Sequence, residues 1–170
     1  MNNQNSILNS MMIIGIDPDL EASGVAIVRN GQIESLQNMD FFDLQEFIQL
    51  QKEVEPDVIF AVEDVELNKA LYAKHNGQKA KVREKIGQNV GQAKGVTRLI
   101  EQYLIRLNCR YVMVAPLKGR FKKAKKDSEY FNRLTGWTGR SNADKRDAAM
   151  IALYGIKPGQ YVPRPSEVPH

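Results

Sequence analysis

The 170-residue chain contains a single cysteine, Cys109, and no apolar run that approaches the length of a membrane span. A lone cysteine excludes a disulfide framework within the chain and a cysteine metal site, and is typical of a reducing compartment. A membrane helix needs about 20 consecutive apolar residues. The start of the chain also lacks the basic and apolar regions of a secretory signal. We therefore expect a cytoplasmic protein that has no membrane partner.

Proline is scarce until the end of the chain, where four of the seven prolines lie within residues 157–170. The first residues, up to Ser10, are mostly polar and have little to bury. Between these ends, a chain that is 42% hydrophobic and 26% charged is long enough for one domain with a buried core. We expect a flexible tail over residues 1–11, one domain over 12–156 and an extended tail over 157–170.

Acidic side chains are nearly absent from two parts of the chain and concentrated in a third. Residues 40–66 hold nine acidic side chains and one basic, residues 69–94 hold seven basic and one acidic, and residues 110–126 hold seven basic and none acidic. The net charge of +4 hides this separation. Such blocks predict an acidic catalytic neighbourhood framed by phosphate-binding surfaces.

Short apolar runs bounded by turn residues predict strands at 12–16, 25–28, 32–36, 58–62 and 110–115. The Asn30-Gly31 pair is typical of a tight hairpin, so the first three strands should form an antiparallel meander. Apolar residues at helical spacing predict helices over 43–52, 79–107, 128–134 and 142–154, with a lysine-rich loop before the third. This order is that of a ribonuclease H-like α/β fold, a mixed five-stranded sheet in which parallel strands follow the meander and helices flank both.

Four carboxylates stand where such a sheet would gather them. Asp17 follows the first apolar strand, Glu63 follows the fourth, and Asp144 and Asp147 lie about 60° apart on one face of the last helix. The ends of the first and fourth strands are neighbours in this fold. A hard divalent cation needs oxygen ligands that converge from separate elements, so the four acids predict a metal-dependent nuclease site. The helical pair also fits a structural role, because the helix dipole favours carboxylates near its N-terminus.

Glu63 is followed by Asp64 and Glu66, so composition alone leaves open which acid is the ligand. Side chains alternate between the two faces of a strand. If Glu63 points to the same site as Asp17, then Asp64 points to the opposite face and has a supporting or structural role.

Four short motifs resemble those of the RuvC family of Holliday-junction resolvases. They are Gly15-Ile16-Asp17-Pro18 with Ser23-Gly24, Ala61-Val62-Glu63, Gly91-Gln92-Ala93-Lys94-Gly95-Val96, and Asp144-x-x-Asp147-Ala148. They follow the family's order and spacing over roughly residues 12–155. The resemblance implies a homodimeric, Mg²⁺-dependent endonuclease that resolves four-way junctions and related branched DNA by paired nicks.

The resemblance also implies roles for single residues. Asp17, Glu63, Asp144 and Asp147 would hold two Mg²⁺ ions, for which Mn²⁺ would substitute, with Asp17 bridging both. Lys118 would complete the catalytic set, because it stands where the family has a lysine that contacts DNA, and it would neutralise the phosphate as charge develops.

This chain departs from the family at two places. Asp19 stands where a glycine is usual, although aspartate tolerates left-handed backbone angles better than most residues. The stretch 64–67 also lacks the aromatic wedge that bacterial members carry after the second acid. The missing wedge is compatible with a phage-type resolvase of broader specificity, which would act in the host cytoplasm if it is phage-encoded, and the sequence does not decide between a cellular and a viral source.

The basic blocks predict contacts with DNA phosphates whose strength falls steeply with salt. Solvated lysines without a function are the alternative. The candidate DNA-binding residues are Lys74, Lys79, Lys81, Arg83, Lys118, Arg120, Lys122, Lys123, Lys125 and Lys126.

Gly87, Gly91 and Gly95 share one face of the predicted long helix. Each glycine costs about 1 kcal/mol in a helix interior, so we expect that face to pack closely on the sheet or on a partner helix.

Three other functions stay open. A ribonuclease that cuts RNA/DNA hybrids would use the same acids. An actin-like or sugar-kinase-like ATP-binding protein has a similar opening to Gly15-Ile16-Asp17, but needs two such lobes. A junction-binding protein without activity would have degenerate acids, whereas all four are present here. The sequence does not decide whether a helicase partner is needed, nor the roles of His75 and Trp137.

Overall fold

The structure is a computed structural model that describes residues 11–67 and 80–170. The described strands are β1 (Met12–Asp17), β2 (Ser23–Arg29), β3 (Gln32–Met39), β4 (Ile59–Glu63) and β5 (Arg110–Val114). The described helices are α2 (Phe41–Val54), α4 (Ala80–Arg106), α5 (Arg120–Lys126), α6 (Ser128–Thr135) and α7 (Ala143–Tyr154), with the short 3₁₀ helices η1 (Val65–Leu67) and η2 (Pro165–Glu167). None of these helices is long and apolar enough to cross a membrane.

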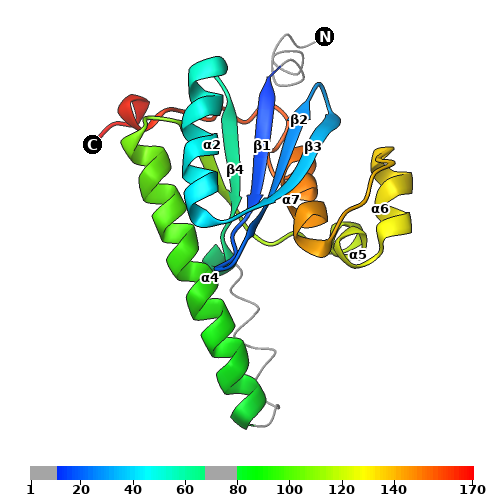
Figure 1. The fold of residues 1–170 in the computed structure, drawn as a ribbon. Helices are drawn as coiled ribbons and strands as arrows, with labels where there is room; N and C mark the ends of the chain where they lie inside the picture. The colour runs from blue at the N-terminus through cyan, green and yellow to red at the C-terminus, as the bar shows by residue number, and fades with distance from the viewer. Residues whose placement is uncertain (1–10, 68–79) are drawn as a thin grey trace.

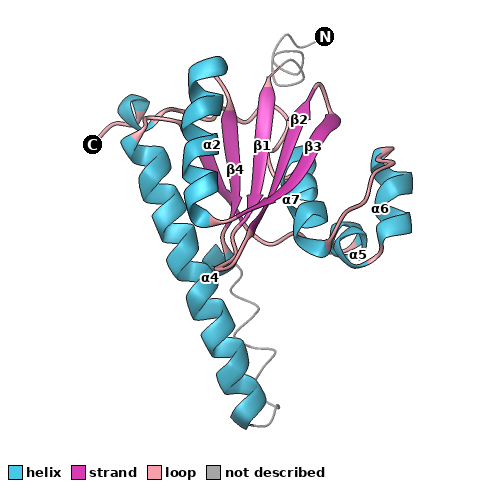
Figure 2. Cartoon of the chain, in the orientation of Figure 1, coloured by secondary structure: helices cyan, strands magenta, loops and turns pink. Residues whose placement is uncertain are grey.

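The five strands form one mixed sheet in the order β3-β2-β1-β4-β5 (Figure 1 and Figure 2). The first three strands are antiparallel, and β4 runs parallel to both β1 and β5. Asn30 and Gly31 have φ angles of 51° and 72°, which are the left-handed values that a tight hairpin turn needs. The predicted ribonuclease H-like fold is confirmed.

Alternate residues of β1 and β4 enter two different cores. The core between the sheet and the pair α2 and α4 contains Ile14, Ile16, Phe60 and Val62. The intervening positions face α7, where Gly15 meets Ala148 and where the buried Ala61 and Ile151 share a second core. Because this alternation continues to the strand ends, Asp17 and Glu63 lie on the α7 face of the sheet.

Two glycines let α7 approach the sheet closely. A Cβ atom at Gly15 would collide with the backbone carbonyl of Ala148, and one at Gly24 would collide with that of Asp144. Both glycines therefore have a packing role, since any larger side chain would push the acidic end of α7 away from β1 and β2.

The segment predicted as a lysine-rich loop is instead the helix α5, so that prediction was wrong. Its apolar positions are few, but Ala124 is completely buried. The centre of the Phe121 ring lies 4.6 Å from the centre of the Tyr154 ring of α7. Packing on α7 therefore stabilises a helix that the lysines alone would not specify. Asp127 ends α5 and caps α6 by accepting a hydrogen bond of 2.9 Å from the amide of Tyr130.

The N-terminal half of α4 extends beyond the edge of the sheet (Figure 1). No described atom lies within 4 Å of the space that a Cβ atom would occupy at Gly87, Gly91 or Gly95. Of the two packing partners predicted for this glycine face, the sheet is therefore excluded for the part of the chain that the structure describes.

The segment after α7 crosses to the opposite end of the sheet, where its side chains are tied to the domain. Arg164 forms an ion pair of 2.6 Å with Asp57, and Arg110 at the start of β5 forms one of 3.2 Å with Glu167. Asn108 and Ser166 exchange two further hydrogen bonds, of 2.9 and 3.0 Å. These contacts dock the C-terminal segment on the domain.

Candidate metal centre

Three carboxylates from three different elements converge at one edge of the sheet. Asp17 ends β1, Glu63 ends β4 and Asp147 lies in α7, and one oxygen atom of each lies within 4.8 Å of the others. The parallel pairing of Ile16 with Val62 places the first two side by side. Glu63 and Asp147 are buried, with exposed fractions of 7% and 6%. Such a buried acidic cluster is unstable unless a cation compensates its charge.

Asp144 lies one turn before Asp147, at the N-terminal end of α7, and is partly exposed. The three-acid cluster does not include its carboxylate. Its charge nevertheless contributes to the raised pKa of Asp17, after the larger effects of burial and nearer neighbours. The structure therefore brings three of the four predicted metal ligands together and leaves Asp144 outside the cluster, one turn away on α7.

A lysine that the sequence analysis assigned to DNA binding enters the cluster. Lys125 of α5 places its Nζ atom 2.6 Å from Oδ2 of Asp147 and 3.3 Å from Oδ2 of Asp17. Lys118, the predicted catalytic lysine, is exposed in the connection between β5 and α5. In a helix, Lys125 lies on the same face as the inward-facing Phe121, four residues before it, but this spacing does not identify the acids that Lys125 meets.

Arg146 links the two helices that carry Lys125 and Asp147, and the sequence analysis missed it. Its guanidinium is largely buried and donates hydrogen bonds to the carbonyl oxygens of Lys125, at 2.9 Å, and Ser141, at 2.8 Å. These bonds fix the end of α5 against the start of α7. An arginine inside an acidic helical motif carries no local signal of this role, because its acceptors lie on another element and a loop.

Burial and like charges raise the pKa values of the acids in the cluster. Burial is the main cause for Asp17, whose pKa is raised to about 7, with Lys125 opposing and Asp147 adding to the effect. Burial is also the main cause for Glu63, whose pKa is raised to about 10, followed by the charges of Asp147 and Asp17. Burial lowers the pKa of Lys125, but the charges of Asp17 and Asp147 outweigh it and raise that pKa overall.

The donor set fits a hard divalent cation. All three converging groups are carboxylates, which are the ligands that Mg²⁺ and Mn²⁺ prefer. Glu63 keeps one buried oxygen, Oε2, without a hydrogen-bond partner among the described residues. Burial favours the protonated forms of Asp17 and Glu63 in the absence of metal, and a divalent cation that displaced the protons would neutralise the negative charge that one ammonium group leaves uncompensated.

The basic candidates occupy two surfaces. Arg120, Lys122, Lys123 and Lys126 are exposed on α5. Arg120 lies 4.9 Å from the centre of the Phe121 ring, and Lys123 lies 4.5 Å from that of Tyr130, so aromatic faces hold both cations.

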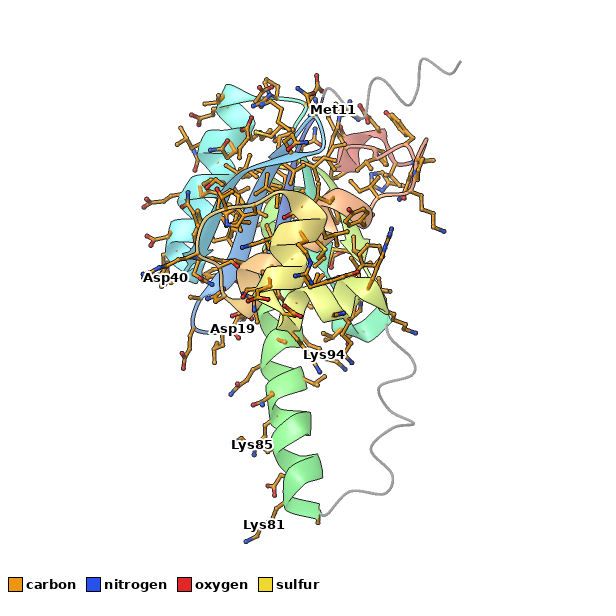
Figure 3. The ribbon with its side chains drawn as sticks, turned by 90° about the vertical axis from the view of Figure 1, so that its right-hand side faces the viewer. Met11, Asp19, Asp40, Lys81, Lys85 and Lys94 are labelled. Carbon is orange, nitrogen blue, oxygen red and sulfur yellow. The ribbon has the colours of Figure 1, made fainter. Side chains whose placement is uncertain are left out.

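The second basic surface is on α4. Figure 3 shows Lys81, Lys85 and Lys94 at intervals along this helix. Lys74 and Lys79, like His75, lie outside the described residues, as does the side chain of Arg83.

Two features that the sequence left open have structural roles here. Asp19 does not adopt a left-handed conformation, and its carboxylate accepts a hydrogen bond of 2.8 Å from the amide of Glu21. The turn therefore forms without the glycine that is usual in the family. Trp137 packs against the core between the sheet, α6 and α7, although its Nε1 atom is buried without a partner among the described residues.

Comparisons with known proteins agree with the fold. No protein-family model and no curated protein matches the chain. A structure of Thermus thermophilus RuvC in complex with Holliday junction substrate matches with a TM-score of 0.52 and 15% identity, over 84% of this chain and 90% of that one. A second Thermus thermophilus RuvC structure gives a TM-score of 0.49 and 15% identity, over 84% of this chain and 92% of that one. The chain therefore has a RuvC-like fold.

Proposed function

We propose that this protein is a metal-dependent endonuclease that resolves Holliday junctions and related branched DNA by paired nicks. The observation that supports this most strongly is the convergence of Asp17, Glu63 and Asp147 within 4.8 Å on a RuvC-like fold. The RuvC structure that matches over 90% of its length contains a Holliday junction substrate. This favours branched DNA over the other substrates of nucleases.

Asp17, Glu63 and Asp147 would hold Mg²⁺, and Asp144 would join them from the end of α7 when a second ion is present. When bound, two such ions supply a nucleophilic water and neutralise the leaving 3′ oxygen of a phosphodiester. The burial of Glu63 and Asp147 restricts the access of bulk water to the ligands. Low local polarity strengthens every charge interaction at the reacting phosphate.

Lys125 would neutralise the phosphate from inside the site. Lys125 pairs with Asp17 and Asp147 in this structure, and its ammonium group would become available to a substrate oxygen once these acids hold a cation instead. Lys118 would act at the rim, because it follows β5, whose carboxyl end lies beside that of β4. Both lysines are thus proposed to stabilise the charge that develops in the transition state.

The exposed cations of α5 and α4 would bind the DNA backbone. Aromatic contacts limit the motion of Arg120 and Lys123, which reduces the entropy that phosphate binding costs. Contacts of this kind release counter-ions, so the affinity for DNA would fall steeply as salt increases.

The glycine face of α4 would pack against the same face of a second copy. Leu99 continues the row of Gly87, Gly91 and Gly95 at the next fourth position, and half of its surface is exposed. A two-fold dimer would present two equivalent sites to the two equivalent strands of a four-way junction. Analytical ultracentrifugation over a range of protein concentrations tests this, and a monomer at all concentrations would exclude the dimer.

The decisive assay is cleavage of a labelled, immobile four-way junction in Mg²⁺. Linear duplex and RNA/DNA hybrid of the same sequence are the controls. Paired nicks near the branch point, with little cutting of the controls, support the proposal. Preferred cutting of the hybrid would favour a ribonuclease, and tight binding of the junction without cutting would favour a junction-binding protein.

A further inference from the structure

The strand that carries Glu63 ends in a second buried acid, Asp64, which is 3% exposed. The backbone amide of Asp64 donates a hydrogen bond of 2.8 Å to the carbonyl of Val114, so the β4–β5 pairing continues past Glu63. One carboxylate oxygen of Asp64 accepts a hydrogen bond of 3.0 Å from the amide of Glu66 in η1. The other oxygen accepts a hydrogen bond from the guanidinium of Arg98 in α4.

Arg98 pairs with acidic side chains through both of its terminal nitrogen atoms. Its Nη2 atom contacts Asp64 and lies 3.1 Å from Glu66, while its Nη1 atom contacts Glu101 one turn along the same helix. Lys94 adds an ion pair of 3.3 Å with Glu66. Arg98 is therefore the centre of a charged network that fastens α4 to the end of β4.

Glu63 and Asp64 are consecutive residues whose side chains point to opposite faces of the sheet. Glu63 faces Asp147 on the α7 side of the sheet, whereas Asp64 faces Arg98 on the α4 side. A backbone shift that turns one of these side chains also turns the other, because they share a peptide bond. The hold of Arg98 on Asp64 therefore restricts the orientation of Glu63.

We propose that Arg98 is a positioning residue, which holds Asp64 behind the sheet and thereby keeps the Glu63 carboxylate in place to bind a divalent cation. This inference rests on the proposed metal centre. Groups outside the ligand shell that orient a ligand typically change metal affinity by about 10-fold to 100-fold when they are removed.

The direction in which cation affinity changes when Arg98 is removed distinguishes a positioning role from an electrostatic role. Arg98 is a cation near a proposed cation site, so a purely electrostatic role predicts that its removal strengthens metal binding. Positioning predicts the reverse, because without Arg98 the buried Asp64 loses its charged partner and the end of β4 relaxes.

The experiment is a calorimetric titration of Mn²⁺ and Mg²⁺ into the full chain without DNA, with thermal unfolding measured in parallel. We expect Arg98→Met to weaken cation affinity by about 10-fold or more. The matched control is Arg110→Met, which removes an arginine that pairs with Asp57 at 3.4 Å and Glu167 at 3.2 Å at the opposite end of the same pair of strands. This control should lower the unfolding temperature and leave the cation affinity unchanged.

Unchanged or tighter cation binding by folded Arg98→Met would overturn the inference while leaving the proposed function intact. An absence of cation binding by the wild-type protein would instead overturn the metal centre itself. If Arg98→Met does not fold, Arg98→Lys takes its place, because it keeps the charge but cannot bridge several carboxylates. Weaker binding by Arg98→Lys than by Arg110→Met supports the inference, and equal binding contradicts it.

Discussion

Lys125 on α5 places its ammonium nitrogen 2.6 Å from the carboxylate of Asp147 on α7. The same nitrogen lies 3.3 Å from Asp17 at the end of β1, so one side chain joins three elements at the acidic cluster. A lysine in this place and a divalent cation neutralise the same oxygen atoms. Their competition has measurable consequences.

Replacement of Lys125 by methionine should strengthen cation binding and weaken the metal-free fold. The substitution keeps most of the apolar stem but removes the charge that compensates Asp17 and Asp147. Without added metal, the unfolding temperature should fall, because a buried acid that loses its partner typically costs about 3–5 kcal/mol, and somewhat less at this partly exposed lysine. Calorimetric titration with Mg²⁺ should give a tighter dissociation constant.

The matched control for that variant is Lys122→Met, on the same helix but exposed to solvent. It should leave both the cation affinity and the metal-free stability close to the wild-type values. A Lys125→Met protein that binds Mg²⁺ no more tightly than this control would contradict competition between the lysine and the cation.

The stability of the metal-free protein should fall as the pH rises. The folded-state pKa values of Asp17, at about 7, and Glu63, at about 10, lie above the ordinary values of 3.8 and 4.5. The folded protein therefore binds more protons than the unfolded chain between these limits, and the contribution to stability is present at low pH and lost as pH rises. Urea unfolding in a chelator at pH 5 and pH 8 measures the difference.

The double variant Asp17→Asn with Glu63→Gln provides the control for the pH dependence, because its amides do not titrate. The loss of stability between pH 5 and pH 8 should become smaller in this variant. An identical pH profile in the variant and the wild-type protein would show that other groups cause it.

Gly15→Ala should destabilise the fold and disturb the site together. The added methyl group would collide with the carbonyl of Ala148, in the turn of α7 that carries Asp147. Overpacking of this kind costs about 1–3 kcal/mol or more. The same substitution at Gly87, where no described atom approaches, should stabilise α4 by up to about 1 kcal/mol in the monomer. Chemical unfolding of both variants checks the contrast, and equal stabilities would contradict the close approach of α7.

Much of the fold and part of the candidate site could be predicted from the sequence, because local periodicity specifies them. The apolar runs of β1 and β4 gave the sheet, and alternation along β4 placed Glu63 and Asp64 on opposite faces, as the structure has them. The three-residue spacing within α7 put Asp144 and Asp147 on one side, but the spacing could not show that only Asp147 reaches the cluster.

The contributions of Lys125 and Arg98 could not be predicted, because both depend on distant partners. Lys125 reaches Asp17 only because Phe121 and Ala124 pack α5 against α7. Five of the seven residues of α5 are cationic, so its sequence does not have the apolar periodicity that predicts a helix. Arg98 meets Asp64 across 34 positions of sequence, and no periodic pattern relates them. Tertiary packing, not local preference, decides such contacts.

The most direct test of the central claim compares wild-type protein with Asp17→Asn on a four-way junction in Mg²⁺. Asparagine keeps the shape of Asp17 and removes one of the three converging charges. We predict that the variant binds the junction nearly as well as the wild-type protein and cuts it at less than about a tenth of the wild-type rate, since removal of a ligand impairs metal-assisted hydrolysis. Cutting by Asp17→Asn at more than about a tenth of the wild-type rate would remove Asp17 from the metal centre and contradict the account.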